Sequence, residues 1–136
     1  MTDINAAIAA AASGMRAQTV RMRIAAENVA NANSTGTDPN QDPFRRRIPL
    51  LESTTLASGA TGVRVRGANF DMSDFREEYN PGHPAANEAG YVQLPNIDTL
   101  VEMMDLREAT RAYEANLNMI EAARTMTNRA LDLLRR

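Results

Sequence analysis

The feature that most constrains the fold is the stretch from Asn96 to Arg136, which contains neither Gly nor Pro. Most of its residues are good helix formers, so it predicts a single helix of roughly 55–60 Å at 1.5 Å per residue. A helix of this length is longer than the diameter of a compact domain built from a chain of this size. We therefore expect it to serve in assembly, and not only as part of a core.

Apolar side chains on this helix follow two neighbouring stripes. The first stripe has heptad spacing and comprises Met103, Leu106, Tyr113, Leu117, Ile120, Leu131 and Leu134. The second comprises Ala109, Ala112, Met119, Ala123, Met126, Ala130 and Leu133, interrupted by Asn116. Because one apolar seam buries one partner helix, two stripes predict more than one neighbour. We expect one stripe to pack on the chain's own first helix and the other to contact neighbouring subunits, with Tyr113 in such a contact.

The first helix is predicted over residues 3 to about 33. Residues that are mostly apolar or small keep heptad spacing, with the polar Gln18 among them: Ile4, Ile8, Ala11, Met15, Gln18, Met22, Ala25, Val29 and Ala32. Gly14 costs about 1 kcal/mol relative to Ala inside a helix, so we expect it to have a packing or hinge role. The following Asn, Ser, Thr and Gly residues up to Gly36 are typical of a helix C-terminus.

An irregular, β-rich insert is predicted between the helices, over residues 37–95. We expect its polar loop at 37–43 to be mobile. Phe44–Leu51 is expected to be extended, and Pro49 restricts this segment to a sheet edge or to a position outside a sheet. Residues 53–61 are small and polar.

Later parts of the insert also carry local signals. The alternating pattern of residues 62–67 predicts a short, half-exposed strand, and residues 91–94 predict a short extended piece. Residues 69–79 predict a strand, or a strand followed by a turn. The sequence from Asn80 to Pro84 is typical of a tight turn, and Asn96 is the expected N-cap of the last helix.

The predicted fold class is mainly α with a small β-rich insert. Residues 1–36 and 96–136 form two long terminal helices, packed antiparallel as a coiled-coil-like pair. The insert, residues 37–95, lies between them as an irregular β knob at one end. Two helices cannot cover all the apolar residues in the stripes, so the surplus predicts partners, including copies of the same chain.

Composition argues against several other classes of function. The chain has no Cys, and its net charge of −2 does not suit a general nucleic-acid binder. No apolar stretch is long enough to span a membrane. No basic residue precedes Arg16, so we expect no cleaved signal peptide.

His83 is the only histidine and has no evident catalytic partners. We expect no enzyme activity, no cofactor or metal, no nucleic-acid partner and no membrane insertion. The residues alone leave a helical coiled-coil adaptor or binding module as an alternative.

Short motifs at both ends carry a resemblance to a known family. Ser13–Gln18 (SGMRAQ) and Glu27–Asn33 (ENVANAN) resemble the N-terminal signature of bacterial flagellar rod and hook axial proteins. Arg111–Asn116 (RAYEAN) resembles the signature of their C-terminal helix. Within this family, the insert is similar to that of the proximal rod subunits at Pro43–Arg47 (PFRRR), Tyr79–Pro84 (YNPGHP), Gly90–Val92 (GYV) and Pro95–Ile97 (PNI). Another short rod-family member is the alternative within the family.

This resemblance implies a structural subunit of the flagellar basal-body rod, which transmits torque across the periplasm and lines the export channel. It implies export by the flagellar type III apparatus without a cleaved signal. The implied partners are other rod proteins, copies of the chain itself, and components of the junction between rod and MS ring. The implied assembly interface comprises Ile8, Met15, Met22, Asn28, Val29, Asn31, Leu106, Tyr113, Asn116, Leu117, Ile120, Leu131 and Leu134. The expected insert contacts, which would select the neighbour, are Phe44, Arg45, Arg46, Arg47, Pro81, Gly82, His83, Pro84 and Tyr91.

Overall fold

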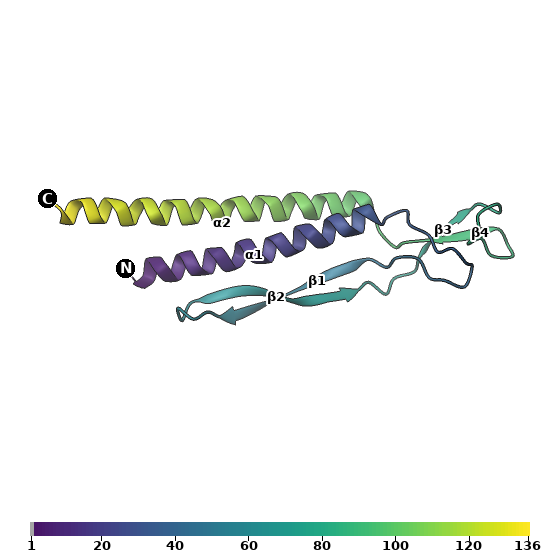
Figure 1. Cartoon of the computed structure of the whole chain (residues 1–136), viewed down its shortest axis with the longest axis horizontal. Helices are drawn as coiled ribbons and strands as arrows, with labels where there is room; N and C mark the ends of the chain where they lie inside the picture. The colour runs from purple at the N-terminus through teal and green to yellow at the C-terminus, as the bar shows by residue number, and fades with distance from the viewer. Residues whose placement is uncertain (1) are drawn as a thin grey trace.

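A computed structural model describes residues 2–136 of the chain. Two long helices, α1 and α2, lie side by side and antiparallel, with four strands between them in the sequence (Figure 1). This arrangement confirms the predicted fold class, mainly α with a small β-rich insert. The elements are α1 (Thr2–Ala30), β1 (Arg47–Thr55), β2 (Thr61–Phe70), β3 (Arg76–Tyr79), β4 (Tyr91–Leu94) and α2 (Thr99–Leu134).

Contacts between the helices fix their register. Asn28 of α1 donates to Glu102 of α2, and a Cβ added to Gly14 would lie 2.7 Å from the Asn116 amide nitrogen. Since α2 has 36 residues and α1 has 29, the last turns of α2 extend beyond the start of α1 (Figure 1).

The seam of α2 that faces α1 does not coincide with either predicted stripe. Glu102, Ala109 and Ala123 are the buried residues of α2, and their spacings are multiples of seven. Tyr113 and Ile120 are half-buried beside this line. The expectation that one whole stripe serves the first helix was therefore wrong. Because α1 packs along the boundary between the stripes, it covers the inner half of each stripe and leaves the outer half exposed.

The buried line of α1 follows the predicted heptad only in part, at Ala11 and Ala25. Its fully buried residues are mostly small, whereas the predicted Met15, Met22 and Val29 are only half-buried. The physical reason is that α1 is covered on two sides, by α2 and by the β1–β2 hairpin, and small side chains allow both to approach closely. Gly14 has the packing role expected of it, since it lies against Asn116. The buried residues of α1 are Ala11, Ser13, Gly14, Ala17, Ile24, Ala25 and Asn28.

The β1–β2 hairpin is a twisted ribbon that runs back alongside α1 and does not form part of a knob beyond the helix ends (Figure 1). Both strands are longer than predicted, because the small polar residues up to Thr55 continue β1 opposite Thr61. Pro49 lies opposite Ala68 in this two-stranded sheet, as expected for an edge strand. Only the β3–β4 hairpin and the loops around it lie beyond the helices (Figure 1).

The start of α2 corrects one further prediction. Asp98, and not Asn96, is the N-cap residue, since its Oδ1 accepts from the Leu100 N–H at 3.0 Å. The Asn96 side chain instead accepts from the Arg46 N–H at 2.9 Å and donates to the carbonyl of Asp71. Asn96 therefore connects the insert to the segment that leads into α2, a non-local role that a capping pattern cannot reveal.

Candidate functional site

A polar junction joins the two helices to the base of the β1–β2 hairpin. Its first member is Asn28, which is 1% exposed. The Asn28 amide donates to the Arg47 carbonyl at 2.9 Å, and its Oδ1 accepts from the Arg47 N–H at 3.1 Å. The same amide nitrogen also donates to Glu102 Oε2 at 3.2 Å. One side chain therefore holds α1, β1 and α2 together.

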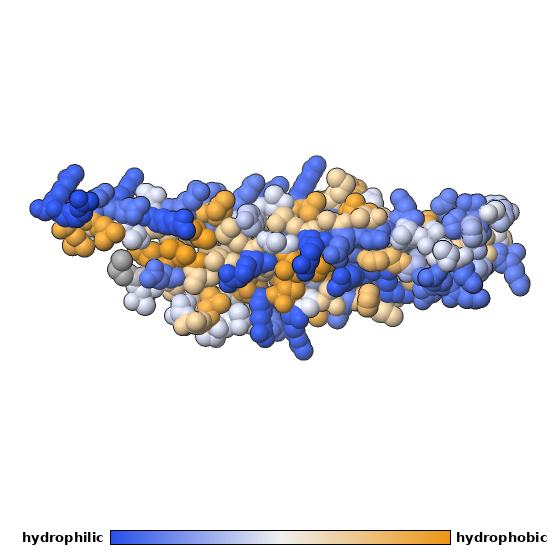
Figure 2. Space-filling model, in the orientation of Figure 1, coloured by the Kyte–Doolittle hydropathy of each residue, from blue (hydrophilic) through white to orange (hydrophobic). Residues whose placement is uncertain are grey.

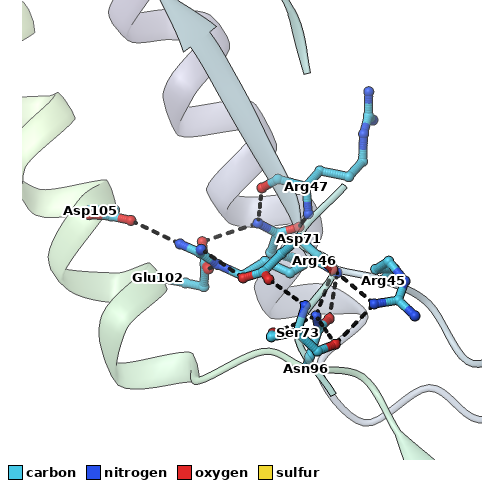
Figure 3. Close-up of polar contacts among 9 residues, drawn as sticks. Arg45, Arg46, Arg47, Asp71, Ser73, Asn96, Glu102 and Asp105 are labelled. Atoms are coloured by element: carbon cyan, nitrogen blue, oxygen red, sulfur yellow. Dashed lines mark hydrogen bonds and ion pairs between the residues drawn. The ribbon is translucent and has the colours of Figure 1, made fainter. Parts of the chain in front are cut away.

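The second and third members are Arg46 and Glu102, which form a hydrogen-bonded ion pair between Nε and Oε1. Glu102 is 2% exposed, so its carboxylate depends on Arg46 and Asn28 in place of water. The Arg46 guanidinium also reaches Asp71 and Asp105, each at 3.5 Å (Figure 3). A basic residue in the insert is thus paired with carboxylates from α2 and from the turn after β2.

The electrostatics of this junction favour the charged forms. Burial lowers the pKa of Arg46, but the hydrogen bond and charge of Glu102, and then those of Asp71, outweigh burial and raise it overall. The pKa of Asp71 is lowered, first by hydrogen bonds from the backbone and side chain of Ser73 and then by Arg46. Arg46 therefore remains a cation, and Asp71 keeps its charge into acidic solution.

The two neighbouring arginines also have partners within the chain. The Arg45 guanidinium lies 4.1 Å from the centroid of the Phe75 ring and donates to the Asp71 and Ser73 carbonyls. Arg47 pairs with Glu27 of α1 at 3.1 Å. We predicted these arginines as insert contacts that would select the neighbouring subunit. Within residues 2–136 both bind groups of their own chain: Arg45 binds the segment after β2, and Arg47 fastens the insert to α1.

Sequence reasoning identified Asn28 and Arg46 but placed them in contacts with other subunits, and it missed Glu102, Asp71 and Asn96 as their partners. A signal for Glu102 was present. It lies seven residues before Ala109 and four before Leu106, so a carboxylate occupies a seam position of the last helix. A charge at such a position requires a buried partner. The identity of that partner, 56 residues away, is not encoded in the spacing.

The predicted interface residues differ in their exposure within the single chain. Asn28 is buried in the junction, and Asn31 donates to the Glu27 carbonyl. Leu117 and Leu131 are exposed, at 38% and 47%, as is Leu134. The remaining members are half-buried along the seam: Ile8, Met15, Met22, Val29, Leu106, Tyr113, Asn116 and Ile120.

Exposed apolar side chains flank the seam of α2 on both sides. We call Met103, Leu117 and Leu131 the first flank, and Met119, Met126 and Leu133 the second flank. Each residue is at least 38% exposed, and within each flank the spacing is a multiple of seven. Figure 2 shows apolar side chains gathered along the helices and at the C-terminal end of α2, whereas the β3–β4 end is mostly hydrophilic.

The predicted turn in the insert lies at that hydrophilic end. Pro81, Gly82 and Pro84 are exposed, whereas His83 is half-buried, with Nε2 3.2 Å from Thr35 Oγ1. The His83 Nδ1 accepts from the Ala85 N–H at 3.0 Å, so His83 organises the turn. Tyr91 is exposed and packs edge-on against Tyr79, with ring centroids 5.3 Å apart. Phe44 is half-buried.

No helix in the described part of the chain is both long and apolar enough to cross a membrane. Paired terminal helices with a short β insert and exposed apolar flanks are typical of subunits that complete their packing in an assembly. The match of residues 88–133 to the family model described as the C-terminal part of flagellar basal body rod FlgEFG proteins is consistent with this class.

Full-length relatives make the assignment more specific. The chain is 43% identical over 136 residues to the flagellar basal-body rod protein FlgC of Agrobacterium fabrum, with 99% of this chain and 98% of the relative covered. It is 38% identical to FlgC of Bacillus subtilis over 90% of this chain and 92% of the relative. For FlgC of Salmonella typhimurium the identity is 34% over the same shares. The chain therefore belongs to the FlgC family of flagellar basal-body rod proteins.

Proposed function

We propose that this chain is a proximal rod subunit that assembles with copies of itself and with other rod proteins through the two flanks of α2. The assembled helices would line the export channel and transmit torque across the periplasm. The observation that carries this proposal is the pair of exposed apolar flanks, one on each side of the seam that α1 covers. A helix in a tube needs contacts on both sides, and the two flanks supply them.

The flanks are large enough to contribute to assembly. Fully burying an exposed Leu or Met side chain contributes about 1.5–3 kcal/mol, and the flank side chains, which are 38–71% exposed, would contribute part of this value each. Three such residues on each flank, repeated around and along a rod, can offset the entropy lost when each subunit associates. Because these contacts are distributed along α2, shear is shared among many side chains, which suits a shaft that carries torque.

The other parts of the proposal concern location and partners. The rod would lie in the basal body, and its subunit would travel through the flagellar type III export apparatus without cleavage of a signal. Near the base of the rod, components of the junction with the MS ring would be neighbours. Arg46 and Arg47 already bind residues of their own chain. The exposed turn at Pro81–Pro84 would therefore be the part of the insert that contacts the neighbouring subunit and determines which one fits.

Paired substitutions on α2 test the role of the flanks. Leu117→Asp places a charge on the first flank, and Asn118→Asp places the same charge one residue away on an exposed polar position. We expect both free proteins to keep their helical content, because neither residue is buried. Only Leu117→Asp should abolish motility and incorporation into basal bodies when it replaces the wild-type chain. Normal motility of that variant would refute the role of this flank, and a motile deletion strain would refute the function.

A helical adaptor predicts a different behaviour in solution. Such a protein would form a discrete small oligomer when purified alone, with its flanks buried between copies. The rod subunit that we propose should instead be monomeric before assembly. Light scattering on the purified chain distinguishes the two, and a stable dimer or trimer of fixed size would favour the adaptor.

A further inference from the structure

The β1–β2 hairpin is attached to α1 by several bonds at its base and by a single hydrogen bond near its tip. At the base, Asn28 bonds both backbone groups of Arg47, and Arg47 also pairs with Glu27. Toward the tip, one hydrogen bond joins the described residues of the hairpin to α1, from the Val63 N–H to Ser13 Oγ at 3.1 Å. The ribbon follows α1 between these two points (Figure 1). The two attachments therefore differ in strength.

The Ser13 hydroxyl is oriented to accept this bond. Ser13 is 2% exposed, and its hydroxyl donates to the Ala10 carbonyl, one turn earlier in α1, at 2.7 Å. The lone pairs of Oγ are therefore left for the Val63 N–H. Val63 lies opposite Ser53 in the ladder, and its N–H points away from β1 toward α1. Protection of the Val63 amide from solvent therefore depends on Ser13.

Gly62 allows the backbone of β2 to approach α1 at this point. A Cβ added to Gly62 would lie 2.6 Å from Ser13 Oγ and 2.8 Å from Leu56 Cδ1. Over the described strands β1 and β2, no residue is fully buried. Segments that bury few apolar side chains are those that open locally at low free energy. The tip is therefore held mainly by the Ser13 hydrogen bond and the close approach at Gly62.

We propose that the β1–β2 hairpin is a strap, with a fixed hinge where Asn28 bonds Arg47 and a releasable latch at Ser13. When the latch opens, the ribbon moves away from α1 as one piece, because its ladder and the junction at its base do not depend on Ser13. Ser13 is a positioning residue for the hairpin, and its neighbour Gly14 admits Asn116 of α2 at the same level of α1. The strap is a property of the free chain and goes beyond the proposed assembly.

Spin-label distances in the free chain test the strap. The chain has no Cys, so Ser58→Cys at the exposed turn of the hairpin and Asn118→Cys at an exposed position of α2 carry the only two labels. With Ser13 intact, we expect one main distance, which corresponds to the closed strap. Ser13→Ala should add a longer distance, because loss of one hydrogen bond raises the ratio of open to closed chains about five- to tenfold.

Two further variants separate the latch from an unspecific effect. Gly62→Ala keeps every polar group of the latch but crowds Ser13 Oγ, so it should also raise the fraction of open chains. Ser53→Ala is the matched control, because it removes an exposed hydroxyl from the opposite strand, and it should leave the distances unchanged. Identical distances in wild type, Ser13→Ala and Gly62→Ala would overturn the proposal, as would an equal change in Ser53→Ala.

Hydrogen exchange distinguishes movement of the ribbon from its unfolding. Arg64 lies opposite Glu52, one pair along from Val63, so its N–H is bonded within the ladder. In Ser13→Ala, the Val63 amide should exchange roughly fivefold faster or more, whereas the Arg64 amide keeps its wild-type rate. An equal increase at Arg64 would show that the ladder melts and would refute the strap. These measurements do not involve assembly, so their failure would leave the proposed rod function unaffected.

Discussion

Replacing Arg46 by Met tests whether the polar junction holds the insert to the helices. The substitution keeps most of the side-chain volume but removes the ion pair with Glu102. Glu102 is 2% exposed, so its carboxylate would remain buried with only the Asn28 amide as a partner. Loss of one member of a buried ion pair typically costs 3–5 kcal/mol. Because Asn28 remains, we expect a value near the lower end, about 3 kcal/mol.

This loss is large compared with the stability of the whole chain, since domains unfold with only about 5–15 kcal/mol. Urea unfolding followed by circular dichroism measures it. The free energy of unfolding of a small protein falls by about 2 kcal/mol per molar urea. The urea concentration at the unfolding midpoint should therefore fall by about 1.5 M. If the dependence of the unfolding free energy on urea is the same as in the wild type, the lower midpoint reflects a loss of stability and not a change in the surface exposed on unfolding.

Arg45→Met is the matched control, because it removes the same charge from the adjacent residue. Arg45 contacts the Phe75 ring and two backbone carbonyls and leaves no buried carboxylate unpaired. Its loss should cost about 1 kcal/mol. The double variant Arg46→Met with Glu102→Met should recover most of the stability lost by Arg46→Met. Equal losses for the two single variants, or a double variant weaker than Arg46→Met, would refute the reasoning.

Three further predictions concern other parts of the fold. Gly14→Val should destabilise the helix pair by about 1–3 kcal/mol, because its Cβ would lie 2.7 Å from the Asn116 amide nitrogen; thermal unfolding measures this loss, and an unchanged midpoint would contradict the close contact. Asp98→Ala should cost about 1 kcal/mol through loss of the N-cap bond to Leu100, measured by urea unfolding. The pKa of Asp71 is lower in the folded chain, so its stabilising contribution is present above its unfolded value, about pH 3.9, and is lost as the pH falls through the folded value. In Asp71→Asn, the free energy of unfolding should therefore fall less steeply as the pH is lowered into the acid range. An unchanged dependence on pH would contradict the stabilising role of the Asp71 carboxylate.

The sequence by itself determined the two helices and the family. Helical periodicity is a local property, so the absence of Gly and Pro after Asn96 was enough to predict α2. The turn at Asn80–Pro84 and the short strand β4 were also predicted correctly, because turn chemistry and alternation act over a few residues. Motifs in both helices pointed to rod proteins before any contact was known.

Tertiary structure decided how these elements meet. Rotation of a helix about its own axis sets which side chains it buries, and this rotation depends on all its neighbours. Hence α1 packs between the two predicted stripes of α2 and leaves a flank exposed on each side. The course of the β1–β2 hairpin along α1 was likewise not predictable from its strand pattern, because that pattern shows alternation but not what the ribbon packs against.

The polar junction shows the same limit most clearly. Asn28 and Arg46 were both identified from the sequence, yet as contacts to other subunits. Their shared partner, Glu102, is 74 residues from Asn28 and 56 from Arg46. A buried carboxylate requires compensating donors, and the sequence shows that need. Only folding, which brings α1, β1 and α2 to one point, determines which donors meet it.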